Sequence, residues 1–330
     1  MRFGLFGGAS ARRDAAVPES AHGYRDFIDY HVEAEALGFY GSFVTEHHFT
    51  AIGQISATLT LLTWIAARTT TLRLGTAVIV LPWHNPVLLA EQAATLDLLS
   101  RGRLDFGVGK GYRNNEFSGF AMPPEQAEAR FDEALSVIRQ AWTADEPFSH
   151  RGPYWDFAQI VVEPPPAQRP HPPLWMAASS DKSIRACAQR DCNLLLDQFA
   201  SPAQTGERIA RYRHELEAAG NLWHPMRVAV ARQFWVASDA ADREGALRRQ
   251  AAANNRLLAL SQGPSSRAGS HILGYSSREA HALIGTADEI TKKLGALRDV
   301  GVHYVLLSGP SSPDNLRRFA REIMPAFASA

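Results

Sequence analysis

The feature that most constrains this chain is an alternation of short apolar runs with amphipathic helical patterns, repeated eight times. Strict strand–helix alternation implies a parallel sheet with right-handed crossovers, and eight such units suit closure into a barrel. The sequence therefore predicts an α/β fold, a TIM (β/α)8 barrel with insertions, and an open doubly wound sheet is the alternative. The eight predicted strands centre on Phe3, Val44, Leu74, Phe106, Trp175, Leu195, Val230 and Val305.

Several helix starts carry capping signals. Asn85 precedes Pro86, which is typical of an N-cap followed by proline at the first helical position. Capping boxes are expected at Ser201–Gln204 and at Thr286–Glu289. On the helix that follows strand three, Asp97 is expected to have a structural role and to pair with Arg101 or Arg103.

Two segments interrupt the alternation. The stretch 143–173 is rich in proline, and we expect Tyr154–Phe157 and Ile160–Val162 to pair there as a small hairpin. The segment Gly263–Leu283 is rich in Ser and Gly without periodicity, which predicts a long loop that acts as a lid over the barrel mouth. Because the alternation resumes after the first interruption, we predict one domain spanning residues 1–330.

Charge and cysteine usage exclude some classes of protein. Among 330 residues, 34 are Lys or Arg and 34 are Asp or Glu, a balance that argues against binding to nucleic acid or to a membrane surface. No apolar run is long enough to span a bilayer, and no signal-peptide pattern precedes Phe3–Phe6. Cys187 and Cys192 are too few for a disulfide framework, so we expect free thiols in packed positions and a cytoplasmic protein.

In a barrel, functional groups collect at the carboxyl ends of the strands. The second strand ends in Glu46-His47-His48, which could suggest a metal site. Successive side chains on a strand point to opposite faces, and no second histidine cluster completes a ligand set, so we predict no metal. One histidine is expected to pack under the rim. The other is expected to project into the mouth, where an imidazole can transfer protons near neutral pH.

Two neighbouring strand ends together predict an anion site. The fourth strand ends in Gly107–Tyr112, which places Lys110 among glycines that let a ligand approach the backbone. Ser179, Ser180 and Ser183 follow the fifth strand at a helix start, where unpaired N–H groups and the helix dipole favour negative charge. A serine that serves only as the N-cap is the alternative.

The third strand ends in small residues, Gly75–Val78. One interpretation is tight packing. The other is a stretch of backbone that lies flat against a planar ring at the barrel mouth.

Taken together, these stretches resemble the bacterial luciferase-like monooxygenase family. The likeness runs from Met1 to about Phe327, and Glu46–Thr50 looks most like the catalytic luciferase subunit. It is carried by Glu46–Thr50, Leu72–Leu81, Leu96–Leu104, Asp105–Tyr112, Pro173–Ser180, Ile284–Thr286 and Gly301-Val302.

The resemblance implies an FMN-dependent monooxygenase. Such an enzyme binds reduced FMN, usually delivered by a separate flavin reductase, and uses O₂ to oxygenate a small organic substrate; we expect a homodimer. It implies that His47, rather than His48, lies at the flavin and assists proton transfer, and that the Ala77–Val78 peptide bond is cis against the flavin ring. The implied cofactor-binding residues are Glu46, Ala77, Val78, Gly109, Lys110, Ala178, Ser179, Ser180 and Ser183. The expected substrate pocket comprises Phe6, Tyr112, Trp175 and Gln198.

The chain departs from the luciferases at four of these positions. Lys110 stands for arginine, Gly109 for cysteine, Ser179 for glutamate and Gln198 for an aromatic residue that stacks near the flavin. These changes argue against light emission and leave the choice of substrate open. Two alternatives remain: an oxidoreductase that uses the deazaflavin F420, and a flavin-binding subunit without turnover, against which His47 argues.

Overall fold

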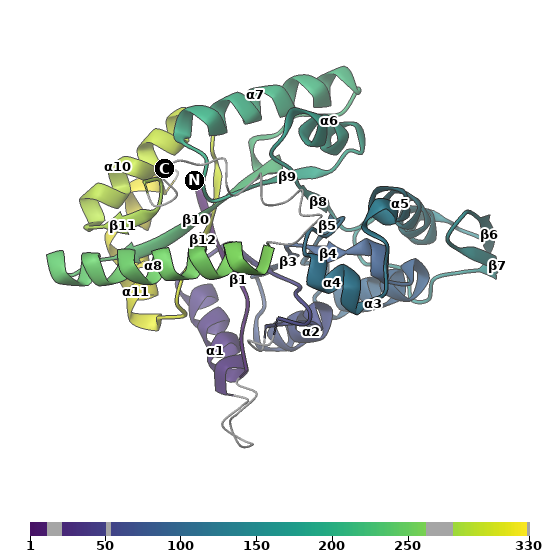
Figure 1. Cartoon of the computed structure of the whole chain (residues 1–330), viewed down its shortest axis with the longest axis horizontal. Helices are drawn as coiled ribbons and strands as arrows, with labels where there is room; N and C mark the ends of the chain where they lie inside the picture. Colours follow the sequence, from purple (N-terminus) through teal and green to yellow (C-terminus); the bar gives the residue numbers. More distant parts are fainter. Residues whose placement is uncertain (12–21, 51–53, 262–279, 329–330) are drawn as a thin grey trace.

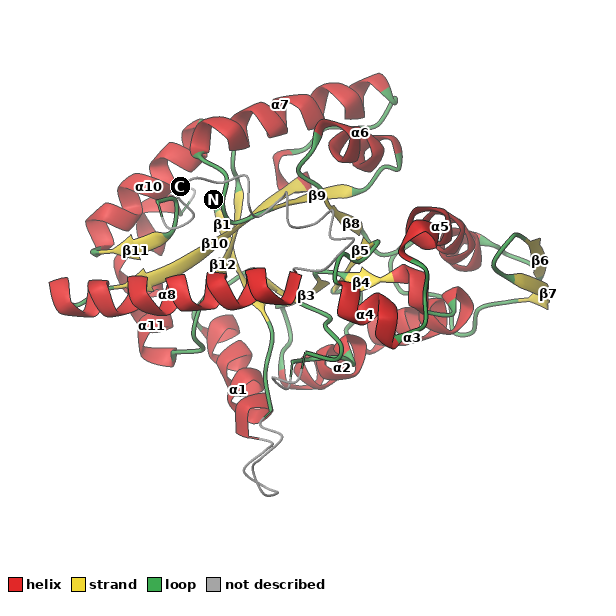
Figure 2. Ribbon diagram, in the orientation of Figure 1, coloured by secondary structure: helices red, strands yellow, loops and turns green. Residues whose placement is uncertain are grey.

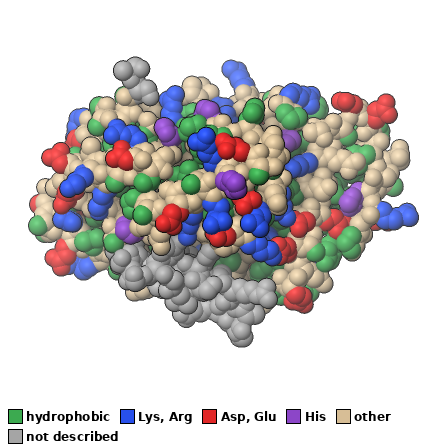
Figure 3. Space-filling model, turned by 90° about the horizontal axis from the view of Figure 1, so that it is seen from above, with side chains coloured by type: hydrophobic (Ala, Val, Ile, Leu, Met, Phe, Trp, Pro, Cys, Tyr) green, Lys and Arg blue, Asp and Glu red, His purple; other side chains and the backbone are tan. Residues whose placement is uncertain are grey.

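The structure is a computed structural model that describes residues 1–11, 22–50, 54–261 and 280–328. The expected lid Gly263–Leu283 lies outside the described residues up to position 279. Across the described part of the chain, every helix is too short or too polar to cross a bilayer. On the face drawn in Figure 3, acidic and basic side chains are interspersed, in keeping with their equal numbers.

Eight parallel strands form a closed barrel (Figure 1). Each strand pairs with the next, and the last pairs with the first through Arg2 and Tyr304, so the barrel has no free edge. The predicted TIM barrel is confirmed, the open-sheet alternative is wrong, and all eight predicted strand centres lie within these strands. The barrel strands are β1 (Arg2–Gly7), β2 (Gly41–Val44), β3 (Arg73–Thr76), β5 (Leu104–Gly109), β8 (Leu174–Ala177), β9 (Asn193–Leu196), β10 (Val228–Val236) and β12 (Tyr304–Ser308).

Helices surround the strands (Figure 2). The predicted caps are confirmed: the Asn85 side chain accepts from two backbone N–H groups, and Ser201 and Thr286 each form a reciprocal capping box. The two ends of the described chain lie side by side (Figure 1), where the Met1 ammonium donates to the Phe327 carbonyl at 2.9 Å. The main helices are α1 (His22–Ala36), α2 (Thr58–Arg68), α3 (Pro86–Leu99), α5 (Ala127–Thr143), α6 (Asp181–Gln189), α7 (Pro202–Ala218), α8 (Ala240–Ser261), α10 (Ala287–Asp299) and α11 (Pro313–Glu322).

The core has two layers. Apolar side chains fill the space between strands and helices, where Cys187 and Cys192 are buried as free thiols, as predicted. A smaller cluster inside the barrel includes Phe43, Trp175 and Tyr304. Trp175 meets the Phe43 ring edge-on at 5.2 Å between centroids, and its indole N–H donates to the Asp105 carboxylate at 3.1 Å.

The expected hairpin exists, but the predicted strands were wrong. Strand β6 (Phe148–Arg151) pairs antiparallel with β7 (Asp156–Ile160), rather than Tyr154–Phe157 with Ile160–Val162. The physical reason is the turn at Gly152, whose N–H donates to a carbonyl three residues on at 2.9 Å and so places the reversal earlier in the chain. The hairpin projects from one end of the molecule (Figure 1).

Three further details differ from the sequence expectations. The predicted run Leu72–Leu81 divides into β3 and β4 (Ile79–Val80). A short strand that we did not expect, β11 (Leu283–Gly285), extends the sheet along the end of β10. Asp97 is structural, but its carboxylate accepts from the backbone and side chain of Gln168 at 2.8 and 2.7 Å, not from an arginine.

Candidate active site at the mouth of the barrel

His47 follows β2 and lies almost buried at the mouth, with 14% of its side chain exposed. Its Nδ1 is 3.1 Å from Oε1 of Glu116, which belongs to the short helix α4 (Asn114–Gly119). The Tyr112 ring stands edge-on to the imidazole, 6.3 Å between centroids. Because the Nδ1 proton is donated to the carboxylate, the neutral ring keeps Nε2 free to accept a proton.

The environment of His47 favours the neutral form. Burial lowers the pKa of His47, the hydrogen bond that its ring donates to Glu116 raises it, and the charge of Arg113 lowers it again, with a net decrease. The ring is therefore neutral near pH 7 and is able to act as a base.

Glu46 and His48 form a separate, buried network. The Glu46 carboxylate accepts from the ring nitrogens of His48 and His84, both at 3.0 Å, and from the Trp83 indole at 2.9 Å. Burial alone raises the pKa of Glu46, but these hydrogen bonds outweigh it and hold the pKa at about 2. Thus His48 has a packing and hydrogen-bonding environment, and Glu46 ties the end of β2 to the turn after β4. Among the described residues no group of His, Cys, Asp or Glu could hold a metal ion.

The residues predicted to form an anion site lie at the ends of β5 and β8, which pair directly. Ser180 caps α6, and its Oγ accepts from the Ser183 N–H at 3.3 Å. The Ser183 hydroxyl in turn accepts from the N–H groups of Ser179 and Ser180 at 3.2 and 3.0 Å. The serines therefore order the helix start, where the dipole favours an anion.

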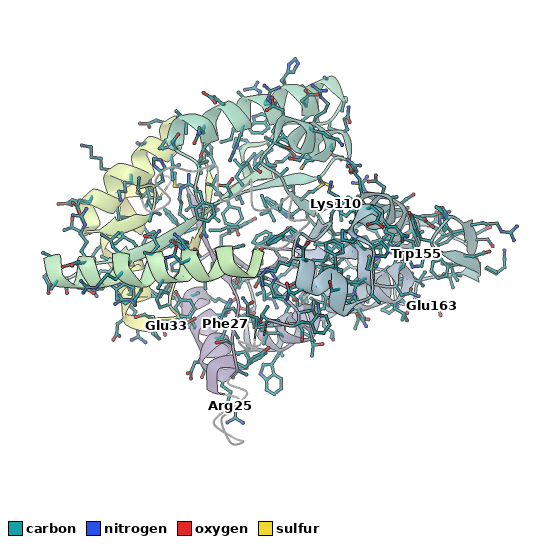
Figure 4. All side chains as sticks on the ribbon, in the orientation of Figure 1. Arg25, Phe27, Glu33, Lys110, Trp155 and Glu163 are labelled. Carbon is teal, nitrogen blue, oxygen red and sulfur yellow. The ribbon has the colours of Figure 1, made fainter. Side chains whose placement is uncertain are left out.

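Lysines supply positive charge beside this helix start. Lys110 follows β5 on the side of the barrel that faces α5 (Figure 4), and its Nζ is 3.5 Å from Oε1 of Glu128 on α5. The Lys182 ammonium is 3.8 Å from the same oxygen. The charge of Lys110 is the main reason that the pKa of Glu128 is lowered. Two ammonium groups share one carboxylate, so the three side chains together carry a net positive charge.

Next to these residues the backbone of β5 passes close to the side chain of Val78. The Ala77–Val78 peptide bond is cis, the geometry implied by the resemblance, and both residues are half-buried at the mouth. A Cβ on Gly109 would lie 2.4 Å from a methyl carbon of Val78. Glycine at 109 thus lets β5 pass directly beside Val78, and a cysteine would force a shift there. Ala178, at the end of β8, is buried.

A cavity of about 440 Å³ lies in the other half of the mouth. Most of its lining belongs to the half formed by β9, β10, β12 and β1, whereas His47 and the predicted anion site belong to β2, β3, β5 and β8. Gln54, which follows β2, and Arg113, which follows β5, reach the cavity from that second half. Helix α8 lies in front of β10 and β12 (Figure 1) and lines the cavity. Of the expected substrate residues, Phe6 and Gln198 line this cavity, whereas Tyr112 lies against His47 and Trp175 lies inside the barrel.

Sequence reasoning missed Arg113 and Glu116. Both are almost fully buried, and they connect His47 to the cavity: Arg113 Nη1 is 4.0 Å from Glu116 Oε1, and Arg113 lines the cavity. One signal could have identified them. They are opposite charges three residues apart in a segment that directly follows a barrel strand, where charged side chains face the mouth.

With the geometry in place, comparison with known proteins identifies the family. The sequence profile of the luciferase-like monooxygenases matches residues 1–304. The chain belongs to this family. The predicted membership of the luciferase-like monooxygenase family is thereby confirmed.

Similar proteins agree with this family. The oxygenase component of a flavin-dependent trigonelline monooxygenase from Acinetobacter baylyi is 25% identical, with 100% of this chain and 96% of that protein covered. An FMNH(2)-dependent dimethylsulfone monooxygenase from Pseudomonas putida is 26% identical over 79% of this chain and 76% of its own. The crystal structure of monooxygenase RslO1 from Streptomyces bottropensis superposes with a TM-score of 0.84 at 26% identity, covering 99% of this chain and 100% of that one. Another curated relative, 32% identical, is matched over 53% of its length.

Proposed function

We propose that this luciferase-like monooxygenase uses reduced FMN and O₂ to oxygenate a small organic substrate, with residues 1–330 forming one catalytic domain. The observation that carries the proposal is the neutral His47, held by the buried Glu116, at a mouth with an anion site in one half and a cavity in the other. A protein that only stores flavin has no use for a base held in this way. The FMNH(2)-dependent relative supports FMN as the flavin.

The residues present fit FMN. Lys110 and the start of α6 would hold its phosphate, and the backbone at Ala77–Val78 would lie against its ring. Bound reduced FMN supplies the electrons with which O₂ is activated. His47 would accept a proton at Nε2 and return it, while the Glu116 carboxylate stabilises the imidazolium that forms.

The direct test is O₂ consumption with chemically reduced FMN, measured for the wild type and for two variants. His47→Ala should lower turnover by about 10²- to 10⁴-fold, the usual contribution of a general acid or base, and leave FMN affinity nearly unchanged. His48→Ala is the matched control: because this ring donates to Glu46, its loss should lower the melting temperature first. Wild-type turnover in His47→Ala would favour a flavin-binding subunit without activity.

The flavin itself distinguishes the main alternative. An F420-dependent oxidoreductase transfers hydride and consumes no O₂. Native mass spectrometry of the protein with FMN, FAD and F420, offered together, should show the FMN complex as the dominant species. Preferred binding of F420 would replace the monooxygenase proposal with a dehydrogenase.

The proposal includes partners for the chain. A separate flavin reductase would supply reduced FMN, as the name of the trigonelline oxygenase component suggests for that system. A homodimer is supported by Trp64, Leu88 and Leu99, which are 63%, 57% and 63% exposed on the adjacent helices α2 and α3. The free thiols of Cys187 and Cys192 are consistent with the reducing cytoplasm.

A further inference from the structure

The cavity in the half of the mouth formed by β9, β10, β12 and β1 has an unusual polarity. Its lining contains two guanidinium groups, Arg113 and Arg249, and no Asp or Glu among the described residues. Five side-chain amides add hydrogen-bonding groups without charge: Gln54, Gln198, Gln233, Gln250 and Asn254. A site with cations and amides but no carboxylate selects against cationic ligands.

We propose that this cavity binds the organic substrate as an anion, with the substrate carboxylate on Arg113 and an aromatic or other apolar body beside Phe234 and Trp235. This inference rests on the proposed function, since it names the substrate class of the same mouth. The volume, about 440 Å³, lies in the range of small-molecule sites.

The state of Arg113 is the first argument. Its side chain is about 1% exposed, its Nη1 donates to Gln54 Oε1 at 3.2 Å, and its Nε has no hydrogen-bond partner. The nearest carboxylate oxygen, Glu116 Oε1, is 4.0 Å away and already accepts from the His48 N–H and the His47 ring. A buried guanidinium with an unpaired donor is stabilised by an added carboxylate, which matches its planar fork.

The amides supply the second argument. Gln250 and Asn254 on α8 are 7% and 2% exposed, yet Gln250 Oε1 and Asn254 Nδ2 have no hydrogen-bond partner. Gln233 on β10 donates to Asn254 Oδ1 at 3.3 Å, and its own Oε1 is also unpaired. Buried polar atoms are normally satisfied, so these amides are placed for hydrogen-bonding groups of a ligand. A substrate with a ring nitrogen, hydroxyl or carbonyl besides its carboxylate would satisfy them.

The apolar wall supplies the third argument. Phe6, Phe234, Trp235 and Ile284 line the same cavity, and the Arg249 guanidinium lies over the Trp235 ring at 4.8 Å. A flat apolar body has aromatic surfaces to contact there, while its charged end reaches Arg113. The arrangement is compatible with small ring-containing acids of different sizes and shapes. It disfavours neutral substrates that are purely aliphatic.

The test uses three probes that share one ring: benzoate, benzamide and benzyl alcohol. Binding to the 330-residue chain is followed by the quenching of Trp235 fluorescence. The Trp235→Phe variant, which should lack this signal, assigns the quenching to that residue. We expect benzoate to bind at least about tenfold tighter than either neutral probe, since a charge-assisted hydrogen bond is at stake. Arg113→Gln should abolish that preference and leave FMN affinity unchanged. Equal affinities in the wild type, or no saturable benzoate binding, overturn the proposal.

One further variant, Arg249→Gln, tests the charge argument separately. Because Arg113 is buried, its replacement could unfold the protein, so Arg249→Gln, at an exposed position, is measured in parallel and should weaken benzoate severalfold. Unchanged benzoate binding in Arg249→Gln together with a retained preference in Arg113→Gln contradicts the charge argument. The titrations need neither reduced flavin nor O₂, so an inactive protein that prefers benzoate refutes the proposed reaction alone. An active oxygenase without that preference refutes the substrate class alone.

Discussion

Replacing Glu116 by glutamine tests how His47 is held. Glutamine keeps the size of the side chain, and its amide oxygen can still accept from the His47 ring and the His48 N–H, which lie 3.1 and 3.0 Å from the present carboxylate oxygen. What is lost is the negative charge. The variant should therefore fold like the wild type and differ in how well it stabilises a protonated His47.

The magnitude follows from the burial of the pair. Only 14% of the His47 side chain and 2% of the Glu116 side chain are exposed, so solvent screens their interaction weakly. A hydrogen bond to a charged group contributes about 1.5–3 kcal/mol, compared with about 1 kcal/mol between neutral groups. If the imidazolium forms in the rate-limiting step, the variant loses about 1–2 kcal/mol of the stabilisation that the Glu116 charge gives to this cation. That loss lowers turnover roughly five- to thirtyfold.

The pH dependence gives a second readout with a defined sign. The carboxylate of Glu116 raises the pKa of His47, while burial and Arg113 lower it. Removing the raising contribution lowers that pKa further. Because the neutral ring is the active base, the ascending limb of kcat/KM against pH should move to lower pH in Glu116→Gln.

The assay is O₂ consumption with reduced FMN between pH 5 and 9, with FMN affinity measured alongside. Glu125→Gln is the matched control, since it removes one carboxylate from an exposed position near α4. It should leave both turnover and the pH profile as in the wild type. Wild-type kcat and an unmoved limb in Glu116→Gln would show that the carboxylate does not act on the catalytic histidine.

Three other outcomes can be measured independently. Lys110→Ala should weaken FMN binding about tenfold or more in a fluorescence titration. Glu128→Gln should strengthen FMN binding, because it removes the carboxylate that lies 3.5 Å from the Lys110 ammonium. Unchanged affinity in Lys110→Ala would count against the phosphate site. Burial lowers the pKa of His31 to about 4 from 6.5, so the unfolded chain binds more protons and the unfolding free energy falls by roughly 3 kcal/mol as pH drops through that window. Urea titrations at a series of pH values should show this loss in the wild type and a smaller one in His31→Gln; identical slopes would refute it. Trp64→Glu should convert a dimer into a monomer in light scattering, and an unchanged mass would remove α2 from the proposed interface.

The barrel could be predicted because its signals are local. Each strand centre, such as Val44 or Val305, is an apolar run of a few residues, and each confirmed cap, such as Ser201 or Thr286, acts within one helical turn. Where the signal was weaker, as in the hairpin around Gly152, the location was right and the pairing was wrong. Pairing depends on where the turn forms, and several turns were compatible with the residues there.

The residues of the candidate site also fall into those that the sequence indicated and those that it did not. Residues that directly follow a strand, such as His47 and Lys110, could be nominated from their position in the alternation. Strand alternation also indicated that only one of the two adjacent histidines would face the mouth. Glu116 and Arg113 lie on or beside α4, a helix of six residues that is too short for a periodic pattern, so only their opposite charges after a strand could have pointed to them.

By itself, then, the sequence determined the eight strands, the helix starts and the strand ends at which the chemistry would lie, whereas the open-sheet alternative was excluded only by the strand pairing in the structure. The tertiary structure alone decided which polar and charged side chains contact one another. The contact of His47 with Glu116 joins residues 69 positions apart, and the bond between the hydroxyl of Ser308 and the amide of Gln198 joins residues 110 apart. The physical reason is that helix and strand patterns depend on neighbours within a few residues. The polarity of a cavity depends on side chains that only barrel closure brings to the same mouth.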